Sequence, residues 1–152
     1  MNNARLNLAC YPAFITSKTR DNHPLFANHA LCEIVVSCLY YGRSKKWFEL
    51  LSFVVMPDHL HLIVIPREKN ISQVMHSIKS YSSKEINRSL SREGPVWQSS
   101  FRDFTISTPV QLLQKAGYIH NNPVRKGLVS EAAEYRFSSA NRSFETDLAN
   151  VL

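Results

Sequence analysis

The sequence contains few cysteines, few glycines and no long apolar run. Its three cysteines, Cys10, Cys32 and Cys38, are odd in number and lack Cys-x-x-Cys spacing, which argues against a disulfide framework or a thiolate zinc site. We therefore expect all three cysteines to be reduced and to lie in the core. No apolar run approaches the ~20 residues that a membrane-spanning helix needs, and the first residues lack the apolar stretch of a signal peptide. These absences predict a cytoplasmic protein that does not enter a membrane.

Internal repeats, low-complexity tracts and linkers are also absent from the sequence. Four glycines and seven prolines in 152 residues leave little room for long disordered segments. The length suits one compact domain better than two. We expect a single domain over residues 1–152, with a core at about 11–130 and a C-terminal tail at about 131–152.

Positive charge is in excess, because 18 lysines and arginines face 12 acidic residues, for a formal net charge of +6. The excess is concentrated between Lys79 and Lys126, where eight basic residues face three acidic ones. This balance favours a polyanionic partner such as a nucleic acid. A basic protein without such a partner is the alternative.

The spacing of apolar and turn residues predicts the order βαββαβα. The predicted strands are 11–19, 48–56, 59–65 and 97–107, and the predicted helices are 29–41, 71–90 and one that starts at Pro109. We expect Gly42 to end the first helix, and the third to stop before Pro123 because proline lacks an N–H donor. The order indicates an α+β protein with a ferredoxin-like (RRM-like) antiparallel sheet, two helices on one face and an added third helix.

Two histidines, His59 and His61, open the third predicted strand in the stretch MPDHLHLIVIP. Side chains alternate along a strand, so the two imidazoles share one face while Leu60 and Leu62 take the other. Burying two polar rings against an apolar core costs free energy. We therefore expect this face of the sheet to hold a metal or to be covered by polar groups. The pattern alone leaves ordinary hydrogen-bonded histidines as the alternative. Asp58 could be an outer-sphere partner of a metal, but its place in the turn between the two strands explains it without such a role.

A second informative stretch is AGYIHNNPVRKGLV, residues 116–129. Tyr118 and Asn122 are four residues apart and therefore share a helical face. The buried side of this helix is expected to hold Leu112, Leu113, Ala116 and Ile119. A tyrosine on a helix more often packs than reacts, so position alone does not identify Tyr118 as a nucleophile.

The two stretches occur together, as PDHLHLIVIP and GYIHNNPVRKGLV, with FITSKTRDNHPLF before them and VWQSSFRDF between them. In this combination the sequence resembles the HUH single-tyrosine transposases, and within them the REP-associated tyrosine transposase branch. The resemblance covers roughly residues 11–140 in a consistent order. It implies that the C-terminal helix carries the catalytic tyrosine.

The resemblance implies a role for each site residue. His59 and His61 would bind a divalent metal, Mg²⁺ or Mn²⁺, and Tyr118 would be the nucleophile that forms a 5′-phosphotyrosine on single-stranded DNA near a REP-like hairpin. Asn122 would be the third ligand, at a place where many related insertion-sequence transposases have a glutamine. The metal, Lys115 or Lys79 could favour ionisation of the phenol.

Other residues have alternative interpretations. The candidate DNA-binding residues are Lys79, Lys84, Arg88, Lys115, Arg125 and Lys126. For Lys84 and Arg88 a solvated helix face is the alternative. Trp97 and Phe101 could stack on bases or pack in the core, and His120 could pack locally or contact DNA.

Two other functions also fit parts of this pattern. One is an RRM-like module that binds nucleic acid without catalysis, although the Lys/Arg-Gly-aromatic signature of such sheets is absent. The other is a small metal-dependent hydrolase in which Tyr118 is dispensable. The resemblance to the REP-associated branch implies a monomer, which we expect here. A dimer is the alternative, because related insertion-sequence enzymes are dimers.

Overall fold

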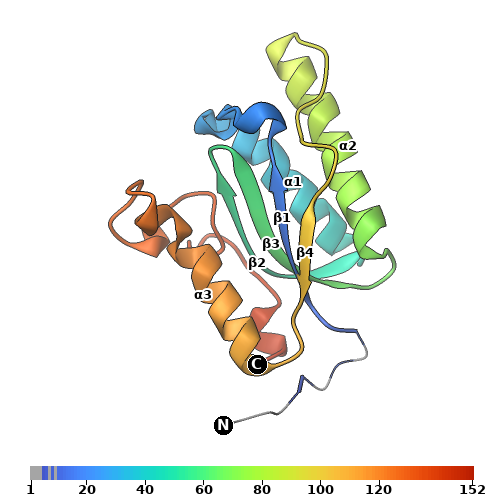
Figure 1. Ribbon diagram of the computed structural model, residues 1–152, viewed down its shortest axis with the longest axis vertical. Coiled ribbons are helices and arrows are strands. Elements are labelled where there is room, and N and C mark those ends of the chain that lie inside the picture. Colours follow the sequence, from blue (N-terminus) through green and yellow to red (C-terminus); the bar gives the residue numbers. More distant parts are fainter. Residues whose placement is uncertain (1–4, 7, 9) are drawn as a thin grey trace.

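The computed structural model describes residues 5–6, 8 and 10–152 and contains a four-stranded antiparallel sheet with strand order β2-β3-β1-β4 (Figure 1). Its main elements are β1 (Ala13–Lys18), α1 (His29–Ser44), β2 (Phe48–Met56), β3 (His59–Pro66), α2 (Ile71–Leu90), β4 (Arg102–Thr105) and α3 (Pro109–Arg125). The predicted order βαββαβα and the α+β, ferredoxin-like class are confirmed.

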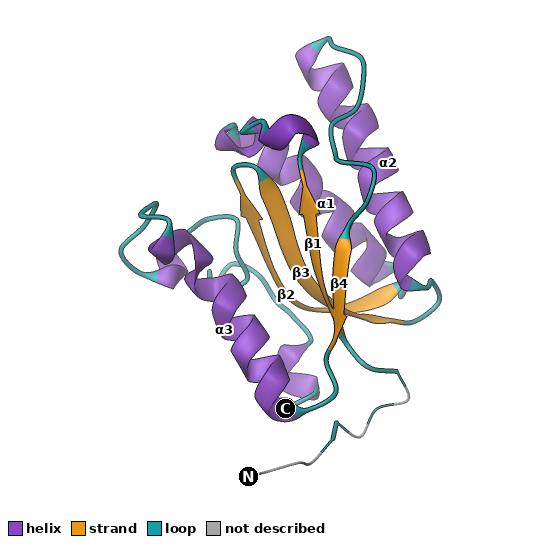
Figure 2. Cartoon of the chain, in the orientation of Figure 1, coloured by secondary structure: helices purple, strands orange, loops and turns teal. Residues whose placement is uncertain are grey.

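Helices cover both faces of the sheet (Figure 2). Leu60, Leu62 and Val64 of β3 pack in one core with α1 and α2, whereas Ile63 and Ile65 pack in a second core with α3. This division follows from the alternation of side chains along a strand. His59 and His61 therefore lie on the α3 face. Their placement opposite Leu60 and Leu62 is as the sequence predicted.

Both long helices after the hairpin begin at capping boxes. The Asn70 side chain accepts the Gln73 N–H, and the Gln73 side chain accepts the Asn70 N–H. Thr108 and Gln111 make the same pair of bonds at the start of α3, where Pro109 occupies the first turn. Such boxes satisfy N–H groups that have no partner within the helix. They explain why the starts of α2 and α3 were predictable.

The prediction that Gly42 ends α1 is wrong, because α1 continues to Ser44. Gly42 is buried inside the helix, where the Phe48 ring packs against its backbone. A Cβ atom at position 42 would lie only 2.4 Å from Phe48 Cε1. The glycine is required for this close approach rather than for helix termination.

The prediction that α3 stops before Pro123 is also wrong. Pro123 is buried inside α3, which continues to Arg125. Proline has no backbone N–H, so the helix lacks only the hydrogen bond from residue 123 to the Ile119 carbonyl. The carbonyls of Asn122 and Pro123 still accept the N–H groups of Lys126 and Leu128, at 3.1 and 2.9 Å. One missing donor near the end of the helix does not terminate it.

The fourth strand is shorter than predicted, since β4 covers only Arg102–Thr105. Trp97 forms an isolated bridge with Thr19 and is buried in the core. Between the bridge and β4, Lys79 Nζ donates to the carbonyls of Gln98 and Ser100, at 2.8 and 3.0 Å. These carbonyls bond to a side chain instead of a neighbouring strand, which explains the interruption.

The segment after α3 runs along the outer edge of β2. Val55 N–H donates to the Phe137 carbonyl at 2.9 Å, and Ser139 N–H donates to the Phe53 carbonyl at 2.9 Å. Further along, Asp147 N–H donates to the Leu50 carbonyl at 2.8 Å. The C-terminal tail therefore covers a strand edge that would otherwise present unpaired backbone groups.

Two expectations from composition can be compared with the structure. Cys32 and Cys38 are buried, but Cys10 is exposed, so the expectation that all three cysteines lie in the core is wrong for Cys10. Cys10 precedes β1 in the sequence and belongs to neither of the two cores. In the part of the chain that the structure describes, no helix combines the length and the apolarity of a membrane span.

Candidate active site

A cavity of about 830 Å³ opens between the end of the sheet and α3. We call it the histidine cavity, because His59 and His61 line it together with Tyr118 and Asn122. The ring centroids of His59 and His61 are 4.6 Å apart, and those of His61 and Tyr118 are 5.5 Å apart. The structure thus brings the two histidines of β3 together with the tyrosine and the asparagine of α3.

Tyr118 and Asn122 lie one turn apart on α3, but their exposure differs. The exposed fraction is 41% for Tyr118 and 2% for Asn122. Ala116 and Ile119 are buried and hold α3 against the sheet, whereas Leu113, which was expected on the buried side, is 56% exposed. Leu113 lies next to Leu112 in sequence and therefore points about 100° away from it around the helix. The phenol is accessible from solvent while the amide of Asn122 is not.

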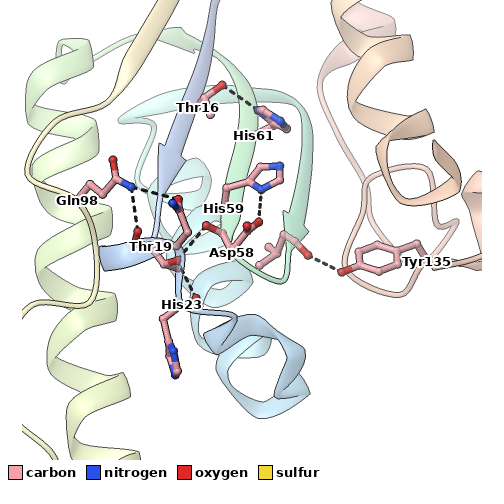
Figure 3. A network of polar contacts seen from close by, with 10 residues as sticks. Thr16, Thr19, His23, Asp58, His59, His61, Gln98 and Tyr135 are labelled. Atoms are coloured by element: carbon pink, nitrogen blue, oxygen red, sulfur yellow. Dashed lines mark hydrogen bonds and ion pairs between the residues drawn. The ribbon is translucent and has the colours of Figure 1, made fainter. Parts of the chain in front are cut away.

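The side chain of Asp58 orients His59. Asp58 Oδ1 lies 2.6 Å from His59 Nδ1 (Figure 3). An ionised carboxylate can only accept, so Nδ1 carries the hydrogen and Nε2 is left for a ligand. The Asp58 carbonyl also accepts from Thr19 N–H and Thr19 Oγ1, at 3.0 and 3.1 Å. Asp58 therefore serves the turn, as interpreted from the sequence, and in addition contacts a candidate ligand.

His61 is held through the same ring atom by a residue of the neighbouring strand. Its Nδ1 lies 2.9 Å from Thr16 Oγ1, and Thr16 pairs with His61 in the β1–β3 register. Donation from Nδ1 to the hydroxyl leaves His61 Nε2 free, as for His59. Burial, followed by the charges of His59 and the nearby basic residues, lowers the pKa of His61 to about 3. The imidazole is therefore neutral near pH 7, the state that a metal ligand requires.

Asn122 supplies a buried acceptor without a hydrogen-bond partner in the part of the chain that the structure describes. Its Oδ1 is inaccessible to solvent and makes no hydrogen bond to any described residue. Leaving such an atom unsatisfied costs about 1–3 kcal/mol. A divalent cation would satisfy it, and two imidazole nitrogens with one amide oxygen form a donor set that suits such an ion. The residues present therefore fit a metal site.

An aromatic residue of β1 packs against two of the residues that line the histidine cavity. Phe14 stacks on His61 with ring centroids 5.3 Å apart, and its ring is 6.0 Å edge-to-face from that of Tyr118. Sequence reasoning missed Phe14, Thr16 and Lys18, although their period-two spacing places all three on one face of β1. Once β1 is paired with β3, that spacing identifies them as neighbours of the histidines.

Basic side chains surround the histidine cavity. Those that line it are Lys18, Arg102, Arg125 and Lys126. The guanidinium carbon of Arg125 lies 4.3 Å from the centroid of the Tyr118 ring, within the range of a cation–π contact. Arg125 and Lys126 were among the residues expected to contact DNA, whereas Lys18 and Arg102 were not identified from the sequence.

The other basic candidates lie elsewhere. Lys115 lies beside Phe14, with Nζ 5.0 Å from the ring centroid of that residue. Lys79, Lys84 and Arg88 belong to α2, on the opposite face of the sheet. The ammonium group of Lys79 bonds to backbone carbonyls and Lys84 is exposed, and neither is among the residues that line the histidine cavity. This placement leaves Lys115, and not Lys79, near Tyr118.

Two further alternatives are resolved by packing. His120 Nε2 lies 2.8 Å from Ser139 Oγ and 3.2 Å from Ser52 Oγ, so His120 packs locally between α3, β2 and the tail. Its burial lowers the pKa of the imidazole. Trp97 is buried in the core and donates to Ser82 Oγ, and Phe101 is partly buried against the same core.

Sequence comparisons agree with this arrangement. The family described as "Transposase IS200 like" matches residues 10–122. A Haemophilus influenzae protein named as a REP-associated tyrosine transposase is 26% identical over 112 residues, which cover 66% of this chain and 64% of that protein. The REP-associated tyrosine transposase of Escherichia coli K12 is 28% identical over 102 residues, 66% of this chain and 59% of that protein. The chain thus spans about three fifths of the length of these curated relatives.

Solved structures show the same fold. A REP-associated tyrosine transposase bound to a REP hairpin matches with a TM-score of 0.73 and 21% identity, over 100% of this chain and 88% of that one. A transposase from Deinococcus radiodurans matches with a TM-score of 0.53 and 19% identity, over 80% and 97% of the two chains. Because the family match extends over most of the sequence and includes the histidines, Tyr118 and Asn122, the chain belongs to the IS200-like transposase family.

Proposed function

We propose that this chain is a metal-dependent endonuclease and strand transferase that cleaves single-stranded DNA near a hairpin through Tyr118. One observation carries the proposal: two imidazoles, a buried amide oxygen and an accessible phenol converge on one cationic cavity. These are the groups that phosphoryl transfer to a tyrosine requires. Family membership supports the same reaction.

In the proposed reaction the Tyr118 oxygen attacks phosphorus. A bond forms between the phenolic oxygen and phosphorus, and the bond from phosphorus to the 3′-oxygen breaks. The phenolic proton is released and the leaving oxygen takes up a proton, which gives a 5′-phosphotyrosine and a free 3′-hydroxyl. A second 3′-hydroxyl then attacks the phosphotyrosine and releases the phenol, so the DNA is rejoined without hydrolysis.

We assign His59, His61 and Asn122 as the residues that hold the metal. The hydrogen bonds that the two Nδ1 atoms donate to Asp58 and Thr16 support this assignment, because they leave both Nε2 atoms available. A bound Mg²⁺ or Mn²⁺ would supply Lewis acidity to the scissile phosphate. Magnesium prefers oxygen ligands and imidazole suits manganese better, so both ions belong in the test.

We propose single-stranded DNA with a hairpin as the substrate. The solved relative that is bound to a REP hairpin supports this choice by analogy. The four basic residues that line the histidine cavity provide phosphate contacts close to the phenol. An unpaired strand can approach a phenol that is 41% exposed, whereas a duplex is more restricted.

We further propose that residues 1–152 act as one catalytic unit and as a monomer. The reason is that His59, His61, Tyr118 and Asn122 all come together within one chain. Sedimentation at several protein concentrations measures the molecular mass directly. A dimer whose activity requires residues of both copies would contradict this part of the proposal.

The test is the formation of a covalent adduct. We expect wild-type protein incubated with hairpin-bearing single-stranded DNA and Mg²⁺ or Mn²⁺ to give a protein–DNA band that survives denaturing electrophoresis. Tyr118→Phe should abolish this band, because it removes the attacking oxygen. Tyr11→Phe, at a half-buried tyrosine outside the histidine cavity, is the matched control and should retain it.

The same assay separates the alternative functions. A nucleic-acid-binding module would bind the DNA without cleaving it. A metal-dependent hydrolase would cleave without an adduct and would keep its activity in Tyr118→Phe. Cleavage that survives in both His59→Ala and His61→Ala would contradict the metal assignment even if the tyrosine proves essential.

A further inference from the structure

A second hollow, of about 710 Å³, lies between α1 and α2, on the side of the sheet opposite α3. We call it the α1–α2 groove. Tyr41 of α1, Trp47 of the following loop and Tyr81 of α2 line it. Tyr41 and Tyr81 are 54% and 58% exposed, respectively. The groove therefore presents neighbouring aromatic rings to solvent. Such a cluster differs from single exposed apolar residues, which are common on protein surfaces.

The aromatic rings of the α1–α2 groove are accompanied by lysines. Lys69 Nζ lies 3.6 Å from the Trp47 ring centroid, and Lys45 Nζ lies 5.6 Å from that of Tyr41. The Tyr41 and Trp47 rings are 5.4 Å apart, edge to face. Lys84 lines the opposite wall.

Acidic side chains are not part of this surface. None of the described residues that line the α1–α2 groove is acidic. Glu85, next to Lys84 on α2, is ion-paired with Arg88 at 3.1 Å. Among the described residues that line the groove, exposed aromatic rings therefore accompany the positive charge of Lys84.

Given the proposed function, we infer that the α1–α2 groove binds single-stranded DNA outside the cleaved phosphodiester. Bases stack on Tyr41 and Tyr81, and phosphates contact Lys45 and Lys84. Aromatic platforms next to basic side chains are the usual means of holding an unpaired strand. The lysines disfavour a cationic ligand, and a duplex keeps its base faces stacked inside. The inference also gives Lys84 a place in DNA binding, although it is remote from the histidine cavity.

The surface between the two hollows supports one continuous strand. A third hollow of about 400 Å³ lies between α2 and the segment 95–101, which runs beside α2 in Figure 1, and it shares His76 and Ser80 with the α1–α2 groove. Gln98, which lines this third hollow, has its Nε2 3.4 Å from Oδ1 of Asn22. Asn22 in turn lines the histidine cavity. A DNA strand that leaves the cavity can therefore pass beside Gln98 and over α2 to the groove.

The inference is tested by binding, with full-length protein and fluorescent oligothymidylates of graded length, in the presence of a chelator. We expect long strands, able to reach the α1–α2 groove, to bind wild-type protein about tenfold or more tightly than strands that only fill the histidine cavity. Tyr41→Ala combined with Tyr81→Ala should remove this gain. The emission of Trp47, identified by comparison with Trp47→Phe, should be quenched by long strands only.

Controls keep the outcome independent of folding. Tyr41→Phe with Tyr81→Phe preserves the rings and should preserve the gain with length. Leu90→Ala, an exposed residue of α2 that does not line the α1–α2 groove, should bind as wild type does. Thermal unfolding of each variant confirms that the exposed positions tolerate substitution.

Several outcomes would overturn the inference. They are equal binding of long strands by the double alanine variant, unquenched Trp47, equal quenching by duplex DNA, and self-association that the same substitutions abolish. The last result would assign the α1–α2 groove to a second copy of the chain. Because the assay measures binding without cleavage, it can fail while adduct formation at Tyr118 succeeds, and the reverse.

Discussion

Each imidazole of the histidine cavity is fixed through Nδ1, but by partners of different strength. His59 faces the carboxylate of Asp58, whereas His61 faces the hydroxyl of Thr16. A carboxylate partner fixes the tautomer and raises the basicity of the ligand more than a hydroxyl does. We therefore expect His59 to depend on its partner more strongly than His61.

Replacement of Asp58 tests this dependence. Asp58→Ala should weaken Mn²⁺ binding by about 10- to 100-fold, because the partner that orients His59 is lost. Asp58→Asn, which keeps an acceptor oxygen, should have a smaller effect. Isothermal titration with Mn²⁺ measures the affinities, and Asp21→Ala at an exposed position is the control. Unchanged affinity in Asp58→Ala would show that Asp58 serves only the turn.

At the scale of elements, α1 and α3 each contain a residue that normally ends a helix. Gly42 stays within α1 because the Phe48 ring occupies the place of a side chain. Pro123 stays within α3 because the carbonyls of Asn122 and Pro123 still accept backbone hydrogen bonds from residues further along the chain. In both helices the tertiary contact or the remaining hydrogen bonds override a local signal.

Two glycine substitutions separate helix propensity from packing. Gly42→Ala should lower the free energy of unfolding by about 1–3 kcal/mol, because the added methyl collides with the buried Phe48 ring. A Cβ atom at Gly117 would meet no side chain of the described residues within 4 Å, so Gly117→Ala should instead stabilise the protein by about 0.5–1 kcal/mol. Urea denaturation measures both. A stabilised Gly42→Ala variant would mean that Phe48 can move aside.

The contact between the tail and β2 depends on charge. Arg43 donates two hydrogen bonds to Asp147, at 2.9 and 3.0 Å, and Leu50 N–H donates a third at 2.9 Å. Burial alone would raise the pKa of Asp147, but these bonds and the charge of Arg43 lower it below the ordinary value of 3.8. The carboxylate thus stabilises the folded state above that pH, and this contribution is lost as the pH falls through the lowered pKa.

Asp147→Asn should accordingly reduce stability in a pH-dependent way. At pH 7 we expect a loss of about 1–3 kcal/mol, because the variant cannot form charged hydrogen bonds. At a pH well below 3.8 the wild type should lose its advantage, and the two proteins should converge. Urea denaturation at both pH values measures the difference, with Asp103→Asn on the exposed strand β4 as the control. A pH-independent difference would contradict the role of the carboxylate charge.

At the scale of the whole molecule, part of the excess positive charge gathers at the histidine cavity. Four basic residues from β1, β4 and the end of α3 meet around the histidine cavity. They come from three segments that are far apart in sequence, so their convergence depends on the pairing of β1 with β4 and on the packing of α3. Phosphate contacts from such residues make DNA binding dependent on salt.

The salt dependence of single-stranded DNA binding tests these contacts. Arg102→Gln and Lys126→Gln should each reduce the slope of log K against log salt by about 0.7, the value for one phosphate contact. Arg142→Gln, at an exposed position in the tail, should leave the slope unchanged. Slopes that are equal in all four proteins would exclude both residues from the interface.

The sequence by itself determined whatever depends on local spacing. The hairpin, the capped starts of α2 and α3, the shared face of His59 and His61, and the shared face of Tyr118 and Asn122 follow from periods of 2.0 and 3.6 residues. Tertiary structure decided which distant residues meet these groups. Phe14 and Thr16 reach the histidines only because β1 pairs with β3, and Lys79 and Lys84 lie on the opposite face because α2 packs there. Pairing between distant strands and helix packing depend on the whole core, which no local pattern records.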